Sequence, residues 1–373
     1  IKKNADGAIT NVICNSAKQG LIPQRDYFDK DIANSDNTGG YYIIETNDFV
    51  YNPRKSTDAP YGPISSYKYP EAGIVSPLYL CFRAKQEINP LYFEWYFRSS
   101  AWHRYIYMSG DSGARHDRVS IKDDTFFAMP INIPTAQEQD RIALFLNVIE
   151  QRIDKQRSLV ESLKKYKRGV IQRVFSGRKG NGKDHYPTWE VSSFGEFFTE
   201  QIIKTSNSPD TPLVSLTVED GITPKTERYY REFLITKEGD NYKAIKPGWF
   251  AYNPMNAHLG AIAANHLGYT AAVSGYYNIF SVNETDTISF WEEYLTSYPM
   301  LIHYKLIATG SLIEKQRVHY SQFVGIRRCL PSVEEQKHLS KLFEAVNRKI
   351  ANAESMERQL VRMRVSLLQQ LFI

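Results

Sequence analysis

Two 44-residue stretches, offset by 197 residues, constrain this chain more than any other feature. Residues 133–176 read IPTAQEQDRIALFLNVIEQRIDKQRSLVESLKKYKRGVIQRVFS, and residues 330–373 read LPSVEEQKHLSKLFEAVNRKIANAESMERQLVRMRVSLLQQLFI. They align without a gap: Glu138-Gln139 matches Glu335-Gln336, and Phe175 matches Phe372. Any fold for this chain must therefore accommodate two copies of one long element.

Each stretch predicts one long amphipathic helix. Thr135 or Ser332 follows a proline, and Glu138 or Glu335 comes three residues later, which is typical of a capping box at a helix start. Apolar residues then recur every three or four positions. The predicted stripes are Ile142, Leu146, Ile149, Ile153, Leu159, Leu163, Tyr166, Val170 and Val174, and Leu339, Phe343, Val346, Ile350, Met356, Leu360, Met363, Leu367 and Leu371. A helix of roughly 60 Å cannot bury such a stripe alone, so we expect the copies to pair as antiparallel coiled-coil helices. The alternative is two unrelated core helices.

The repeat extends beyond the helices. Phe49-Val50-Tyr51-Asn52-Pro53 matches Phe250-Ala251-Tyr252-Asn253-Pro254, and Arg118-Val119 matches Arg317-Val318. Strand-like patches at 41–44, 49–51 and 74–82 and a helix at Pro90–Ser99 predict an α+β globule. We therefore predict a pseudo-two-fold repeat of two mixed α/β domains separated by the helices. The predicted boundaries are 1–132 for domain 1, 133–176 for helix 1, 177–185 for a linker, 186–329 for domain 2 and 330–373 for helix 2.

Composition places the chain in a broad class. With 373 residues it is too long for one typical domain, and its net charge of +5 permits an anionic partner. No apolar run reaches the ~20 residues that span a bilayer. Cys14, Cys81 and Cys329 stand alone, which favours a reducing, cytoplasmic location and argues against a zinc site. We expect residues to precede Ile1, because the opening of the second half, Tyr186 to Phe198, has no equivalent in the first.

Motifs that could carry catalysis fail in detail. Gly177, Gly182 and Lys183 fit a P-loop, but Asp184 stands where Ser or Thr would bind Mg²⁺. Asn52-Pro53 and Asn253-Pro254 match only the start of the Asn-Pro-Pro-Tyr motif of adenine methyltransferases. We therefore predict no catalytic residues, no metal ligands and no cofactor in this chain.

Loops rich in hydrogen-bond donors are the candidate sites. Arg reads guanine, and Asn or Gln reads adenine, through paired hydrogen bonds in the major groove. The candidate DNA-binding residues are Arg25, Asn52, Arg54, Lys55, Ser112, Arg115, His116, Arg118, Lys225, Arg228, Tyr230, Arg231, Asn253, Asn256, His258, Ser311, Lys315 and Arg317. The alternative for any one of them is a solvated polar loop. The basic run 164–168 could contact a DNA backbone or simply favour the helix dipole.

Two variable globules, each followed by [IL]-P-[TS]-x-x-E-Q, a long helix and Q-x-[VL]-F, resemble the specificity subunit of type I restriction–modification systems. The resemblance implies two target-recognition domains that each read half of a split, asymmetric site in double-stranded DNA. It implies a non-catalytic subunit that docks two modification subunits and the restriction subunits, which supply S-adenosylmethionine, ATP and Mg²⁺ chemistry. Two alternatives stay open: a coiled-coil scaffold whose globules bind protein, and a stand-alone methyltransferase or nuclease. The bases read and the spacing between half-sites do not follow from the sequence.

Overall fold

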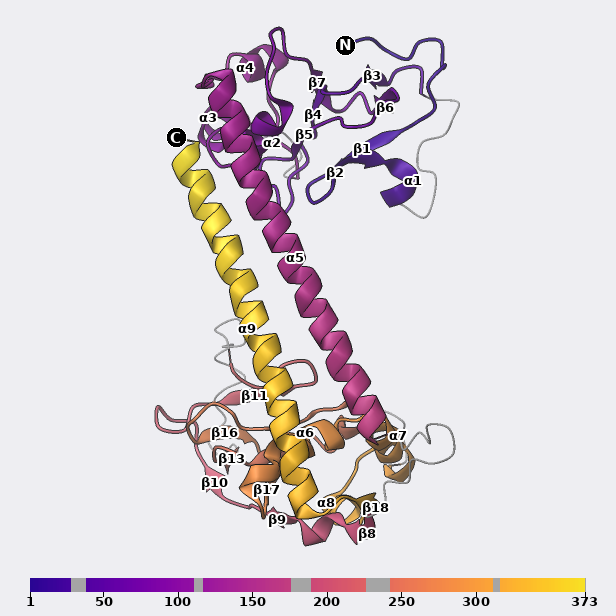
Figure 1. Ribbon diagram of the computed structural model, residues 1–373, viewed down its shortest axis with the longest axis vertical. Helices are drawn as coiled ribbons and strands as arrows, with labels where there is room; N and C mark the ends of the chain where they lie inside the picture. The colour runs from indigo at the N-terminus through magenta and orange to yellow at the C-terminus, as the bar shows by residue number, and fades with distance from the viewer. Residues whose placement is uncertain (28–37, 111–116, 176–188, 226–241, 311–315, 373) are drawn as a thin grey trace. The chain divides into compact units, whose positions relative to one another are not determined.

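The computed structural model describes residues 1–27, 38–110, 117–175, 189–225, 242–310 and 316–372. The chain forms two compact units. Unit 1 is Ile1–Arg157 with Ser355–Ile373, and unit 2 is Ser158–Glu354. The long helices α5 (Ala136–Phe175) and α9 (Val333–Leu371) each contribute to both units (Figure 1). Each unit therefore combines one globule with a part of both helices, a division that cuts across the sequence-based boundaries.

Unit 1 is a mixed α/β globule built on small antiparallel sheets. Its elements before α5 are β1 (Ile13–Ser16), β2 (Gly20–Pro23), α1 (Gln24–Tyr27), β3 (Tyr42–Ile44), β4 (Phe49–Tyr51), β5 (Ile64–Ser66), β6 (Gly73–Val75), β7 (Leu80–Phe82), α2 (Pro90–Arg98), α3 (His103–Ser109) and α4 (Asp123–Phe127). The strands pair as β1-β2, β3-β6 and β5-β4-β7. The helix predicted at Pro90–Ser99 is confirmed as α2, which Asn89 caps through its side-chain oxygen. The patch at 74–82 is two strands, because a turn closes between Ser76 and Tyr79.

Unit 2 repeats this plan with additional strands. Its elements are β8 (Glu190–Ser193), η2 (Phe194–Glu196), β9 (Phe198–Glu200), β10 (Lys204–Thr205), β11 (Val214–Thr217), β12 (Gly221–Pro224), β13 (Tyr242–Ile245), β14 (Phe250–Tyr252), η5 (Ala257–Leu259), β15 (Ile262–Ala264), β16 (Ala271–Ser274), β17 (Asn278–Val282), η6 (Thr285–Thr287), α6 (Ile288–Leu295), α7 (Tyr298–Ile307), α8 (Tyr320–Val324) and β18 (Arg327–Leu330). Its main sheet has the order β15-β14-β17-β9, beside sheets β10-β13-β16, β11-β12 and β18-β8. The central pairing is the same in both units: Phe49 lies opposite Phe82, and Phe250 lies opposite Phe280. Both phenyl pairs stack, with centroids 5.5 and 5.1 Å apart. The internal repeat is thus structural as well as sequential.

The long helices run antiparallel within each unit. In unit 1, Arg157 pairs with Glu357 at 3.1 Å, and Glu150 pairs with Arg364 at 2.6 Å. Residue numbers therefore rise along α5 where they fall along α9. In unit 2, Lys164 lies 2.9 Å from Glu354. The predicted antiparallel pairing is confirmed.

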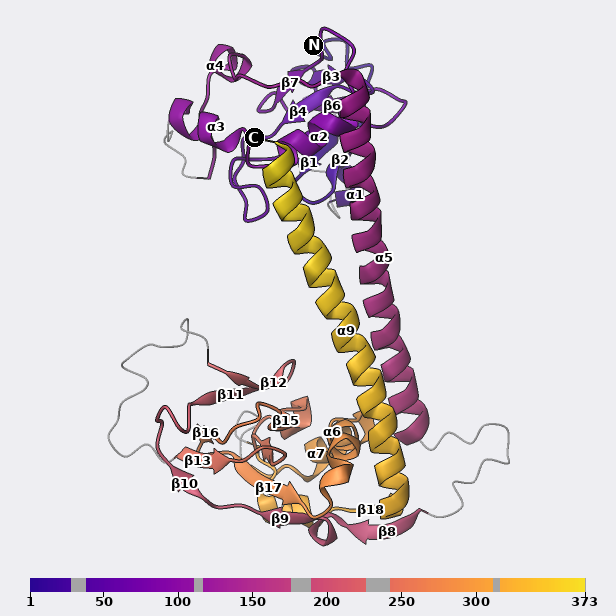
Figure 2. The same cartoon turned by 60° about the vertical axis from the view of Figure 1, so that its left-hand side comes forward.

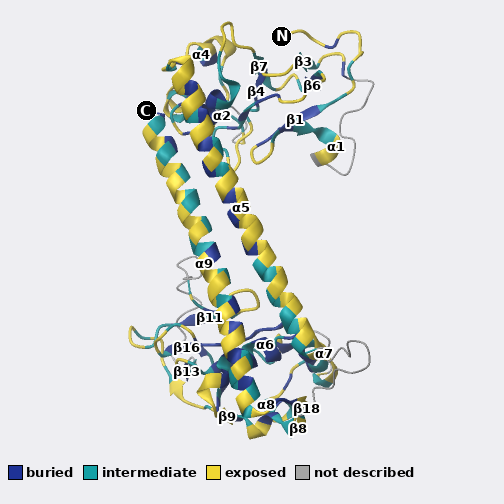
Figure 3. Ribbon diagram, in the orientation of Figure 1, coloured by how far each residue is buried: buried dark blue, intermediate teal, exposed yellow. Residues whose placement is uncertain are grey.

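The buried stripe departs from the predicted one at its middle. Leu159 and Tyr166 on α5 are exposed, as are Met356 and Met363 on α9. The buried positions there are Gln156, Val160 and Ala353. Figure 3 shows buried and exposed positions alternating along both helices. The prediction followed the large apolar side chains. In a helix, however, the position three residues after Ile153 or Ile350 lies on the same face as that isoleucine, whatever its residue type. Gln156 and Ala353 therefore face the partner helix.

The end of each helix packs into the globule that the other half of the sequence builds. Phe372, at the end of α9, lies 5.4 Å from Tyr92 and 5.8 Å from Tyr96 of α2, and Figures 1 and 2 show the last turn of α9 beside that helix. Phe175, at the end of α5, lies 5.8 Å from Phe290 and 5.0 Å from Tyr294 of α6. The repeated terminal phenylalanine is therefore an anchor that ties each half of the chain to the other.

The repeated Glu-Gln pair explains how each long helix begins. Gln139 and Gln336 are buried, and their amides donate to the carbonyls of Pro134 and Pro331 at 3.0 and 2.9 Å. The Oε1 of Gln139 also accepts a hydrogen bond from the backbone of Asn89, just before α2. In unit 1 the glutamine thus links the start of α5 to the segment just before α2.

Candidate functional site

A tight turn at Asn52-Pro53 follows the central strand β4 of unit 1. The Oδ1 of Asn52 accepts a hydrogen bond from the backbone N–H of Arg54 at 3.1 Å, and its Nδ2 donates to the carbonyl of Asn15 at 3.2 Å. Gly62 lies against this turn with φ +86°, and a Cβ there would stand 2.1 Å from the carbonyl oxygen of Asn52. The Asn52 amide is therefore committed to shaping the turn that presents Arg54.

The turn after β14 in unit 2 has the same construction. The Oδ1 of Asn253 accepts from the backbone N–H of Met255 at 3.0 Å. In both units a valine then closes the turn from a distant segment: Val119 donates to the Pro53 carbonyl at 2.9 Å, and Val318 donates to the Pro254 carbonyl at 3.0 Å. The structure thus brings together, in each unit, two landmarks that are far apart in the sequence.

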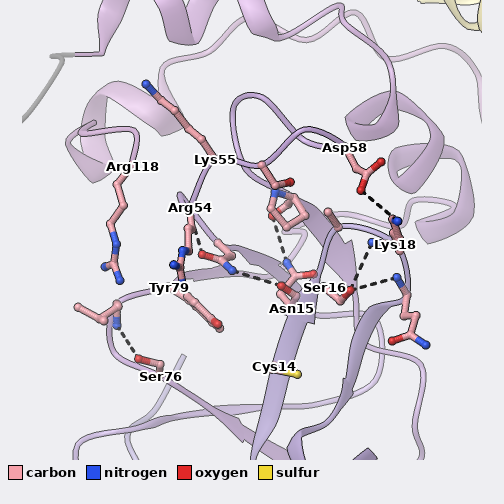
Figure 4. Close-up of a pocket in the computed structure, with 16 residues that line it drawn as sticks. Cys14, Asn15, Ser16, Lys18, Arg54, Lys55, Asp58, Ser76, Tyr79 and Arg118 are labelled. Carbon is pink, nitrogen blue, oxygen red and sulfur yellow. Dashed lines mark hydrogen bonds and ion pairs between the residues drawn. The ribbon is translucent and has the colours of Figure 1, made fainter. Parts of the chain in front are cut away.

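A basic cleft of about 780 Å³ opens beside the turn of unit 1 (Figure 4). Among the described residues that line it, Lys18, Arg54, Lys55 and Arg118 are basic, and Asp58 alone is acidic. The cleft is lined by Cys14, Asn15, Ser16, Ala17, Lys18, Gln19, Asn52, Arg54, Lys55, Ser56, Asp58, Pro63, Ser76, Leu78, Tyr79 and Arg118. Excess positive charge in a concave surface favours an anionic partner.

The cations of the cleft are only loosely neutralised. Lys18 lies 3.6 Å from Asp58, and Arg54 lies 3.7 Å from Asp117, and all four side chains are largely exposed. Exposed ion pairs of this length contribute little to stability and are readily exchanged for another anion. Either cation could therefore exchange its carboxylate for another hydrogen-bond acceptor.

Arg118 is a half-buried member of the cleft. Its Nε is buried and has no hydrogen-bond partner among the described residues. Tyr79 lies nearby, and burial raises the pKa of its phenol, an effect that a backbone hydrogen bond and the charge of Arg118 partly offset. A buried donor without an acceptor is costly, so this guanidinium is well suited to receive an anion.

The other predicted residues fall at several places. Arg25 is exposed on α1, and Lys225 directly follows β12. Asn256 is exposed in the second turn, His258 lies in η5, and Arg317 is exposed just before Val318. The predicted residues Ser112, Arg115, His116, Arg228, Tyr230, Arg231, Ser311 and Lys315 lie outside the described residues, as does the linker 177–185.

Sequence reasoning missed Lys18, Asn15 and Tyr79 as members of the cleft. Lys18 sits in the short turn between β1 and β2, and a basic residue two positions before Gly20 was the available signal. Tyr79 lies in the turn between β6 and β7, and burial raises the pKa of its phenol. Nothing local indicated that either residue would face the Asn52 turn.

In the described part of the chain, no group of three His, Cys, Asp or Glu side chains is placed to hold a metal ion. None of the described helices is long and apolar enough to cross a membrane.

Comparisons with known proteins identify solved structures that share this fold. No protein-family model matches the chain, and no curated protein matches it in sequence. A solved structure described as "Structural basis underlying complex assembly and conformational transition of the type I R-M system" is 16% identical, with a TM-score of 0.55 over 88% of this chain and 82% of that one. The type I restriction–modification S subunit from M. genitalium is 14% identical, with a TM-score of 0.50 over 92% of this chain and 87% of that one. The chain therefore has the fold of type I specificity subunits along most of its length.

Proposed function

We propose that this chain is the DNA-specificity subunit of a type I restriction–modification enzyme, binding a bipartite, asymmetric DNA site without catalysing a reaction itself. The observation that carries this proposal is the repeated turn. Both units build the same junction of an Asn-Pro turn with an Arg-Val segment, and they present different side chains on it. Two similar frames with different reading groups are what a protein needs to read two different half-sites. The likeness in fold to type I specificity subunits supports the same conclusion.

The DNA-binding surface of unit 1 is proposed to be the basic cleft. Arg54, Lys55 and Arg118 approach the DNA, and Asn52 acts as a positioning residue because its amide is already engaged in the turn. In unit 2 the corresponding surface is the Asn253 turn, with Asn256, His258 and Arg317 as contacts. Arg25 and Lys225 complete the proposed surface, and the candidates that lie outside the described residues stay predictions. The basic excess of the cleft would contribute binding that is independent of sequence and weakens with salt.

The partners are proposed to be two modification subunits and, with them, restriction subunits. Leu144, Phe145 and Val148 of α5 are 66, 49 and 55% exposed, although the same helix buries its opposite face. Exposed apolar side chains gathered on one helix face are typical of protein-interaction sites. We therefore propose that a modification subunit docks on this face of α5. S-adenosylmethionine, ATP and Mg²⁺ would then act in the partner subunits.

The test is to assemble the chain with its modification subunits and to map adenine methylation across a genome. The expected result is one bipartite motif, with two different half-sites separated by a gap of fixed length. The isolated chain, tested alongside, should bind DNA and transfer no methyl groups. Methylation by the isolated chain would make it an enzyme in its own right. An assembled complex without any sequence preference would instead favour a protein-binding scaffold.

A further inference from the structure

The two turns share some side chains and differ in others. At the two positions that follow Asn-Pro, unit 1 has Arg54 and Lys55, whereas unit 2 has Met255 and Asn256. The arginine of the closing segment, in contrast, is present in both units, as Arg118 and as Arg317. In each unit, the arginine that recurs and the turn residues that differ thus lie on the same junction of turn and closing segment.

The recurring arginine is held by the same backbone link in both units. Arg118 and Arg317 each immediately precede the valine that donates to the proline carbonyl of the turn, at 2.9 and 3.0 Å. Arg118 also bridges in antiparallel fashion with Arg54, and Arg317 with Thr309. A backbone held from two sides places the arginine Cα reproducibly beside the turn.

Positions whose residue recurs and positions whose residue differs suit different parts of DNA. Phosphates are the same at every step of a DNA duplex, whereas base edges change with sequence. A group that contacts phosphate can therefore be identical in two domains that read different half-sites. A group that contacts bases must differ: Arg or Lys matches guanine, Asn matches adenine, and Met offers apolar contact only.

We propose, building on the proposed function, that Arg118 and Arg317 are the phosphate anchors of the two half-sites. The neighbouring positions that differ, Arg54 and Lys55 in unit 1, then discriminate between bases. Two observations support this proposal: the buried Nε of Arg118 has no hydrogen-bond partner among the described residues, and the side chain lines the basic cleft. Figure 4 shows Arg118 and Arg54 on the same side of that cleft, opposite Lys18 and Asp58.

The experiment measures DNA affinity of the full complex with modification subunits, from 50 to 200 mM salt, on the mapped site and on duplexes altered in one half-site. Arg118→Gln and Arg317→Gln should weaken binding to all duplexes by the same factor. Each should lower the slope of log K against log salt by about 0.9, the value for one lost phosphate contact on duplex DNA. The affinity ratio of wild type to variant should therefore fall about three- to fourfold across this salt range. Arg118→Lys keeps the charge and should retain the slope.

The matched control is the transplant Arg54→Met with Lys55→Asn, which gives unit 1 the side chains of unit 2. It should change base preference at one half-site and leave the other unchanged. The inference is overturned if Arg118→Gln relaxes base preference at one half-site while the salt slope stays constant. It is also overturned if the transplant weakens all duplexes equally. A wild-type complex that shows no sequence preference would instead refute the proposed function itself.

Discussion

Removing the phenylalanine at the end of α9 should destabilise the globule built by the other half of the sequence. Phe372 is 6% exposed and contacts Tyr92 and Tyr96 in the aromatic core of unit 1. Phe→Ala changes in such sites cost about 3–5 kcal/mol, because both the burial and the filled volume are lost. We therefore expect Phe372→Ala to weaken α2, some 280 positions earlier in the chain.

Hydrogen exchange measured by mass spectrometry is the appropriate assay, because a chain with two compact units need not unfold in one step. A loss of about 3–5 kcal/mol raises exchange through opening by roughly two to three and a half orders of magnitude. The increase should appear in α2 and the first part of α5. Peptides from α6 should stay unchanged.

Two further variants make the prediction specific. Phe175→Ala should have the converse effect: hydrogen exchange should rise in α6 and stay unchanged in α2. The rise should be smaller because Phe175 is only half-buried. Met363→Ala, at an exposed position on the helix that ends just before Phe372, should leave exchange in both globules unchanged. If Phe372→Ala instead loosened α6, the reciprocal anchoring described above would be wrong.

Three other changes follow from individual contacts. Gly62→Ala should cost at least about 1–3 kcal/mol, since alanine is strained at φ +86° and has no room there, and a thermal melt equal to wild type would contradict this. Arg364→Met should cost about 1–3 kcal/mol by leaving the half-buried carboxylate of Glu150 unpaired, and Glu150→Gln added to it should restore part of the loss in urea unfolding. His266 donates to or accepts from Glu292 at 2.8 Å, and this hydrogen bond raises the pKa of its imidazole. Its modest stabilisation should be fully present below about pH 6.5 and be lost as the pH rises through the raised folded-state pKa, so the stability difference between wild type and His266→Gln should narrow over that rise.

The sequence by itself determined the repeated elements of this protein. The capping residues, the three-and-four spacing and the matched Asn-Pro turns are carried by residues close together in the chain, and such local signals survive without knowledge of the fold. The long helices, the helix α2 and the antiparallel pairing were predicted in this way. The exposed Leu159 and Met363 show the limit of that reasoning, because a stripe defined by large side chains ignores the small or polar residues that face the partner.

Only the tertiary structure decided which surfaces meet. Phe372 packs on α2, and the Asn52 turn is closed by Val119, through contacts between residues far apart in the sequence. Two carboxylates at matching positions of α2 and α6 show the same limit. Glu94 binds Ser66 and Lys68, and its counterpart in unit 2, Glu292, binds the backbone of Ala264 and the ring of His266. Partners of this kind are set by the path of the chain and the space left in the core, which no local pattern of residues encodes.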